Sequence, residues 1–165
     1  VGVEAELSGT EGCTSRLSSV LSALSERFDY IFIDCPPSLG LITTNALTAS
    51  DTILIPIQCE YYALEGLSQL TRTIKIVKQS LNKDLKIEGV LLTMFDSRTK
   101  LSAQVAEEVR KHFAATVYDT VIPRNVRLSE ASSYGQPIVH FDKSSKGAKC
   151  YTKLAAEVIK AQKGK

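Results

Sequence analysis

The chain has 165 residues, of which 44% are hydrophobic and 23% are charged. This composition is typical of one folded globular domain and excludes a mostly disordered chain. No apolar run reaches the ~18 residues that a membrane-spanning helix needs, so we expect no membrane partner. The net charge of +2 is distributed unevenly, since residues 1–70 carry −7 and residues 111–165 carry +6. A basic C-terminal part suggests a polyanion-binding surface, although charges that intersperse on folding explain the same numbers equally well.

The first predicted elements are four apolar runs rich in β-branched residues. They occupy residues 28–33, 52–57, 89–93 and 116–122. The first three runs are continuously hydrophobic, which is typical of strands covered on both faces, as in a parallel sheet.

Helical patterns fill the intervals between these runs. Apolar residues recur at helical spacing over residues 16–26, 64–81, 101–113 and 144–160, and Ser102 is a candidate N-cap of the third helix. This alternation predicts an α/β fold with a parallel sheet, helices on both faces and right-handed connections. No linker or repeat interrupts the pattern, so residues 1–165 are expected to form a single domain.

Ligands of open α/β sheets bind beyond the carboxyl ends of the strands. Four segments occupy that edge in the predicted fold, at residues 34–40, 58–66, 94–100 and 123–130. Asp34 ends the first predicted strand before a Pro-Pro turn, which matches a Walker B carboxylate that helps to hold phosphate-bound Mg²⁺. The alternative is an aspartate that caps the following turn, and the local pattern alone favours this alternative.

Other site motifs are absent from the sequence. The 165 residues contain no Gly-x-x-x-x-Gly-Lys-[Ser/Thr] phosphate loop, no Gly-x-Gly-x-x-Gly and no Gly-x-Ser-x-Gly. The four cysteines form no Cys-x-x-Cys pair, and with two histidines they give little support to a zinc site. This cysteine usage indicates a reduced, cytoplasmic protein.

Several segments together resemble one family. Residues 28–40, 56–67 and 88–96 are similar to segments of the ParA/Soj partition ATPases, and residues 121–131 carry the most distinctive likeness. The resemblance continues through residues 142–151 and covers essentially the whole chain from about residue 28, and more loosely from residue 1.

The resemblance implies a P-loop NTPase fold of the deviant Walker A group. Members dimerise around ATP and Mg²⁺, bind double-stranded DNA without sequence preference, and hydrolyse ATP when a ParB-type partner stimulates them. They position plasmids or chromosomal origins on the nucleoid. The implied catalytic and metal residue is Asp34, and residues 36–40, beginning with Pro36, correspond to the γ-phosphate sensor called switch II. The implied adenine-pocket residues are Met94, Pro123 and Asn125, and the implied DNA contacts are Arg98, Lys100 and Arg127.

One departure separates the chain from the family. The family's phosphate loop and first strands precede the segment that begins here, and nothing before Arg16 can supply them. The chain is therefore expected to be the C-terminal part of a ParA-type ATPase domain and to be inactive alone.

Two alternative functions remain. One is a non-catalytic DNA- or protein-binding fragment. The other is a ParA-like positioning ATPase with another cargo, although MinD relatives carry a C-terminal amphipathic membrane helix and this sequence has no apolar face beyond Ile159.

Overall fold

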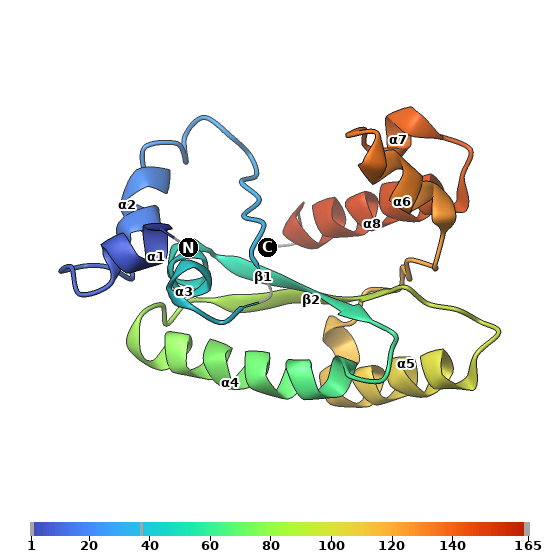
Figure 1. Ribbon diagram of the computed structural model, residues 1–165, viewed down its shortest axis with the longest axis horizontal. Coiled ribbons are helices and arrows are strands. Elements are labelled where there is room, and N and C mark those ends of the chain that lie inside the picture. The colour runs from blue at the N-terminus through green and yellow to red at the C-terminus, as the bar shows by residue number, and fades with distance from the viewer. Residues whose placement is uncertain (1, 37, 164–165) are drawn as a thin grey trace. The chain divides into compact units, whose positions relative to one another are not determined.

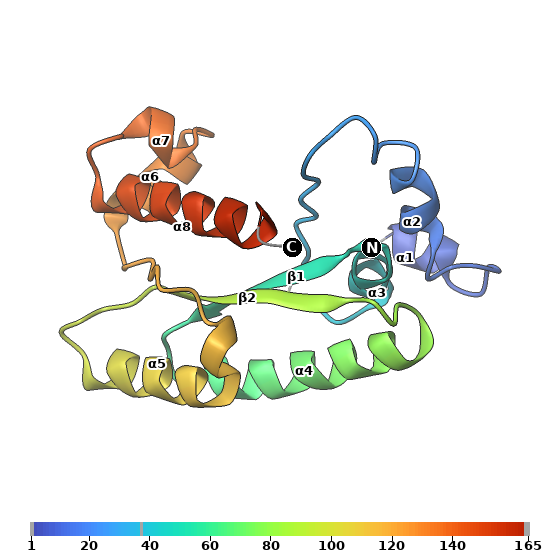
Figure 2. The same cartoon turned by 180° about the vertical axis from the view of Figure 1, so that it is seen from behind.

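A computed structural model of the chain describes residues 2–36 and 38–163. By its internal contacts the chain divides into two compact units. Unit 1 consists of Val1–Ile53 and Leu67–Lys86, and unit 2 consists of Leu54–Gly66 and Ile87–Lys165. Figure 1 and Figure 2 give the elements of both units with their labels.

Unit 1 is built from helices joined by two asparagine side chains. Its helices are α1 (Gly2–Leu7), α2 (Arg16–Leu21), α3 (Leu41–Ala49) and most of α4 (Ala63–Ser80). The buried Asn45 amide accepts the Leu17 N–H at 3.3 Å and donates to the Cys13 carbonyl at 2.6 Å, which fixes α2 against α3. Asn82 donates to the Ser50 carbonyl at 2.8 Å and so closes the end of α3. The apolar core beneath consists of Leu47, Val77, Leu85 and Ile53.

The first predicted strand does not form. Residues 30–36 have no regular secondary structure, and Phe28 and Phe32 are 56% and 77% exposed. The apolar composition was the reason for the prediction, but a strand also requires a neighbour that bonds its N–H and C=O groups. None of the described strands pairs with this segment. The predicted helix over residues 16–26 is likewise shortened to α2, with turns from Ser22 onward.

The second and third predicted strands are confirmed as β1 (Thr52–Gln58) and β2 (Lys86–Thr93), which pair directly. The Lys86 N–H donates to the Asp51 carbonyl at one end, and the Cys59 N–H donates to the Thr93 carbonyl at the other. The residue numbers of both strands rise in the same direction from the first bond to the second, so the pairing is parallel. The expected burial of both faces holds for residues 89–92 of β2, whereas Pro56 and Gln58 of β1 are exposed.

The fourth predicted strand is reduced to two parallel bridges, Val90 with Val117 and Phe95 with Pro123. The Tyr118 and Ile122 N–H groups donate to the carbonyls of Val90 and Leu92, so four residues on one side match two on the other. The excess residues form a bulge. The Glu157 carboxylate accepts the N–H groups of Asp119 and Thr120 at 3.1 and 3.2 Å. A helix side chain thus occupies two amides that a regular ladder would use.

Helices cover both sides of the parallel strands in unit 2. Its elements after β2 are α5 (Lys100–Phe113), the 3₁₀ turn η1 (Ala114–Thr116), α6 (Val126–Ser133), α7 (Ile138–Phe141) and α8 (Lys146–Lys163). In both views α5 and α8 lie on opposite sides of β2. The core under α8 contains Leu91, Tyr118, Ile122 and Leu154. This arrangement confirms the predicted α/β class with a parallel sheet and helices on both faces.

The N-cap of α5 differs from the prediction. Thr99 caps the helix, and its side chain accepts the Ser102 N–H. Ser102 is 4% exposed, and its hydroxyl serves the site described below. None of the described helices is long and apolar enough to cross a lipid bilayer.

Candidate functional site

Three loops of unit 2 follow parallel segments and meet at one edge. They are residues 59–62 after β1, residues 94–99 after β2 and residues 123–125 after the bulged segment. The Phe95 N–H donates to the Ile122 carbonyl and the Arg124 N–H donates back to the Phe95 carbonyl, at 3.1 and 3.0 Å. The carboxyl-end loops therefore come together as the parallel sheet predicts.

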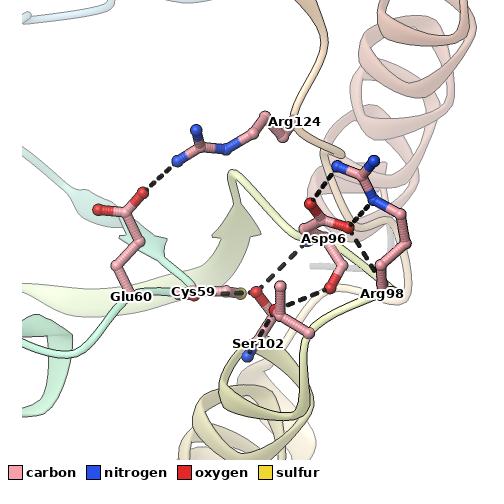
Figure 3. A network of polar contacts seen from close by, with 7 residues as sticks. Cys59, Glu60, Asp96, Arg98, Ser102 and Arg124 are labelled. Atoms are coloured by element: carbon pink, nitrogen blue, oxygen red, sulfur yellow. Dashed lines mark hydrogen bonds and ion pairs between the residues drawn. The ribbon is translucent and has the colours of Figure 1, made fainter.

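A buried serine joins the first two loops (Figure 3). The Ser102 hydroxyl donates to the Cys59 carbonyl at 3.1 Å and accepts the Asp96 N–H at 3.4 Å. Cys59 is 1% exposed, and burial raises the pKa of its thiol. The Ser102 hydroxyl thus ties the loop after β1 to the loop after β2. The Cys59 side chain itself is a buried apolar group.

The three residues implied for the adenine pocket all lie at this edge. Met94 directly follows β2 with a φ of 52°, a left-handed conformation that is strained for a residue other than glycine. Pro123 bridges to Phe95, and Asn125 is the N-cap of α6, whose side-chain oxygen accepts the Arg127 N–H at 2.9 Å. The Asn125 Nδ2 donates no hydrogen bond within the described part of the chain, so it is available to an acceptor on a ligand.

Arg98 forms a two-point ion pair with Asp96. Its Nε and a terminal nitrogen donate to the two carboxylate oxygens at 2.9 and 2.7 Å. These hydrogen bonds hold the pKa of Asp96 well below its usual range and raise the pKa of Arg98. The Arg98 side chain is nevertheless 84% exposed. The Arg98 guanidinium is therefore accessible to solvent while it is paired with the Asp96 carboxylate.

Arg127 is held in the same way from three directions. It donates to Asp142 at 2.9 Å and to Glu130 at 2.6 Å, and these hydrogen bonds, Asp142 first, raise the pKa of Arg127. Its guanidinium also lies 4.9 Å from the centre of the Phe141 ring, a cation–π distance.

Arg124, in the segment 123–130 that the sequence predicts at the strand edge, forms a third pair. Its terminal nitrogen is 2.6 Å from the Glu60 carboxylate, 64 positions away in the sequence. By contrast, Lys100 is exposed and has no ion pair among residues 2–36 and 38–163.

The implied catalytic segment lies in unit 1. Asp34 and Pro36 are exposed and lie in irregular backbone, and Pro37, which belongs to the switch II segment, lies outside the described residues. The far end of that segment is anchored, because the buried Thr43 hydroxyl donates to the Ser38 carbonyl at 2.6 Å and Gly40 is the N-cap of α3. Mg²⁺ in nucleotide sites is held by one or two carboxylates, waters and the phosphates themselves. One exposed carboxylate fits that role chemically, and the described residues contain no cluster of three metal-ligand side chains.

The carboxylate partners of the arginines are the functional neighbours that sequence reasoning missed. Two of them carry a local signal. Asp96 precedes Arg98 by two residues, and Glu130 follows Arg127 by one helical turn. The Asp142 and Glu60 contacts join distant positions and have no such signal.

Comparisons with known proteins give one family model and several curated relatives. The AAA domain family matches residues 1–87. The chain is 61% identical over 157 residues to the sporulation initiation inhibitor protein Soj of Bacillus subtilis, covering 95% of the chain and 62% of Soj. It is 57% identical over 159 residues to the chromosome partitioning protein ParA of Myxococcus xanthus, covering 96% of the chain and 56% of that relative. The chain thus spans about three fifths of the length of these curated relatives.

Solved structures share the fold. A cobyrinic acid a,c-diamide synthase from Mycobacterium smegmatis, with bound ADP and magnesium, is 37% identical with a TM-score of 0.80, over 98% of this chain and 59% of its own. The cell division ATPase MinD of Pyrococcus furiosus is 31% identical with a TM-score of 0.68, over 89% and 58%. The family match over more than half of the residues places the chain in the AAA domain family, and its similarity within the curated proteins is to Soj and ParA.

Proposed function

We propose that the chain is the C-terminal part of a single ParA-type ATPase domain, which partitions plasmid or chromosomal DNA by ATP hydrolysis. The observation that carries the proposal is the 61% identity to Soj over 95% of the chain. In this proposal the whole protein binds ATP and Mg²⁺, pairs with a second copy in the ATP state, and responds to a ParB-type partner. It acts in the cytoplasm, on the DNA of the nucleoid.

The nucleotide would lie at the loop edge of unit 2. Residues Met94, Pro123 and Asn125 would contact adenine, and the free Nδ2 of Asn125 is a suitable donor to a ring nitrogen. Bound Mg²⁺ neutralises charge on the transferred phosphoryl group, and Asp34 would orient it through water. The phosphate-binding loop would come from the part of the relatives that this chain does not match. The Mycobacterium smegmatis relative, which binds ADP and magnesium, supports this choice of ligands.

The DNA surface would consist of Arg98, Lys100 and Arg127. Arg98 lies in the loop after β2, Lys100 is the first residue of α5, and Arg127 lies in the first turn of α6; all three are exposed. Both arginines are already paired with carboxylates. DNA phosphates would therefore have to compete for the guanidinium groups with Asp96, Glu130 and Asp142. Lys100 has no such competitor and would bind phosphate directly. Binding of this kind is electrostatic, independent of sequence and weakened by salt.

ATP turnover tests the catalytic part of the proposal. The isolated 165-residue chain should hydrolyse no ATP, whereas the full-length protein should do so and be stimulated by its partner and DNA. Asp34→Ala in the full-length protein should lower kcat by at least ~100-fold, and Asp29→Ala, in the same exposed segment, should not. Mg²⁺-dependent turnover by the isolated chain that disappears in Asp34→Ala would refute the proposal.

Duplex titrations test the DNA surface. In the full-length protein, Arg98→Glu and Arg127→Glu should each weaken binding about five- to tenfold and lower the salt slope by about one, equally for two unrelated sequences. Arg127→Gln separates lost attraction from repulsion by Glu130 and Asp142. Lys111→Glu is the matched control, because it makes the same charge change at the far end of α5, ~16 Å from Lys100. Unchanged affinity and salt slope in the loop variants would exclude this surface.

A further inference from the structure

The ion pair between Arg124 and Glu60 joins the two outer loops of the site edge (Figure 3). Glu60 follows β1 and Arg124 follows the bulged segment, with the end of β2 between them in the pairing order. Both side chains are about half exposed, at 56% and 49%, and their atoms are 2.6 Å apart. A half-exposed ion pair adds little to the stability of a fold. Its position gives it a local consequence.

Arg124 stands between two residues of the proposed adenine pocket. Its backbone N–H is bonded to the Phe95 carbonyl, which ties the segment to the end of β2. Immediately after it, Asn125 caps α6 through its side-chain oxygen. The backbone is thus fixed at Arg124 and just after it. The ion pair of the Arg124 guanidinium with Glu60 is a third restraint on the same short loop.

Glu60 is itself held in place by the adjacent backbone. The Cys59 N–H donates to the Thr93 carbonyl at 2.9 Å, and the Cys59 carbonyl accepts the Ser102 hydroxyl. The Glu60 N–H turns back to the Gln58 carbonyl at 2.9 Å. The carboxylate therefore extends from a loop residue whose backbone is bonded back to the end of β1, and it can anchor Arg124.

We propose that Glu60 is a positioning residue for base recognition, which acts through Arg124 to fix Pro123 and Asn125 at the distance and angle that the purine base requires. The inference rests on the proposed nucleotide site at this edge. Adenine presents an amino donor at position 6 where guanine presents an oxygen acceptor. Discrimination between them depends on polar groups held at hydrogen-bond distance. A loosened loop therefore binds ATP more weakly and distinguishes it less well from GTP.

A double-mutant cycle in the full-length protein tests this positioning role. Fluorescent analogues of ATP and GTP are titrated against wild type, Glu60→Gln, Arg124→Gln and the double variant. Each single variant should weaken ATP binding about threefold, from the ~0.6 kcal/mol typical of such a pair, and lower the ATP-to-GTP preference by a similar factor. The double variant should be no worse than either single one, and the exchanged pair Glu60→Arg with Arg124→Glu should recover part of the preference. Glu65→Gln, an exposed glutamate on the first turn of α4, is the matched control and should behave as wild type.

The outcomes separate the inference from the function on which it rests. The preference ratio does not depend on the fraction of folded protein, so a purely structural loss would lower the signal and leave the ratio unchanged. If wild type binds ATP and the two single effects add, Glu60 does not act through Arg124 and the inference fails alone. An increase in DNA affinity on Glu60→Gln, with unchanged nucleotide binding, would overturn it too and make Arg124 a phosphate contact. Absence of ATP binding by wild type would overturn the proposed function itself.

Discussion

Residues 28–34 and strand β2 are similar as sequences and differ as structures. Both are apolar, rich in β-branched or aromatic residues, and followed by residues that the sequence analysis assigned to the site. β2 pairs with β1 on one side and bridges to Val117 on the other, and Val90 and Leu92 are fully buried. Residues 30–34 bond to none of the described strands and expose Phe32. The difference shows that apolar composition supplies the capacity for a strand, while neighbours on both sides decide whether it forms.

Amide hydrogen exchange of the isolated chain should give the largest contrast between the two segments. The amides of residues 30–34 should exchange within about tenfold of an unstructured peptide, because they have no ladder partner. The amides of Val90 and Leu92 should exchange at least ~100-fold more slowly, since they lie in the paired core. Equal protection of both segments in the isolated chain would contradict the comparison.

Glycine substitutions test the tight packing of β2 from within. A Cβ on Gly89 would lie 2.3 Å from the Tyr118 ring, so Gly89→Ala should lower the free energy of unfolding by about 2 kcal/mol. Gly66→Ala in α4 meets nothing within 4 Å and should raise that free energy by about 0.5–1 kcal/mol through helix propensity. Urea denaturation measures both values. A tolerated Gly89→Ala would mean that Tyr118 moves freely, and that β2 is less constrained than its burial indicates.

The Tyr118 hydroxyl gives a smaller effect in the same core. Its oxygen is buried and makes no hydrogen bond within residues 2–36 and 38–163. Burial, with the nearby charges of Glu88 and Glu157, raises the pKa of Tyr118 to about 12. Removing an unsatisfied buried polar group is favourable, so Tyr118→Phe should raise the free energy of unfolding by about 1 kcal/mol in chemical denaturation. A loss of similar size would show that the hydroxyl has a partner.

The titration of Asp96, just beyond β2, gives the smallest signal. Hydrogen bonds from Arg98 hold the pKa of this carboxyl well below the ~3.9 of an unfolded chain. The folded state is therefore favoured above about pH 4, and this contribution declines as the pH falls through the lower folded-state pKa. Carboxyl NMR should find Asp96 still ionised at pH 3, and Arg98→Gln should return its pKa towards the ordinary value. Lys111→Gln should leave it unchanged, and a wild-type Asp96 that titrates near pH 4 would contradict the ion pair.

Sequence reasoning succeeded where the signal was local or periodic. The helices α4, α5 and α8 and the strands β1 and β2 follow from apolar spacing, and the loops of the site edge follow from parallel topology. It failed where a distant partner decides the outcome. Residues 28–33 lack a strand neighbour, and Glu157 bonds to two amides in the run over residues 116–122. Thr99 caps α5, while the Ser102 hydroxyl donates to the Cys59 carbonyl. The pairing of Glu60 with Arg124 joins loops that only the fold brings together.

The bulge beside β2 has a consequence for how the protein resists aggregation. A strand at the border of a sheet normally offers unpaired N–H groups that can recruit a strand from another molecule. Here the amides of Asp119 and Thr120 are already taken by the Glu157 carboxylate from α8. The partly exposed Glu157 carboxylate also repels the carbonyl groups of an approaching chain. Glu157 thus blocks these two amides from pairing with another molecule, and Glu157→Gln or Glu157→Ala would expose them and favour aggregation through added strands.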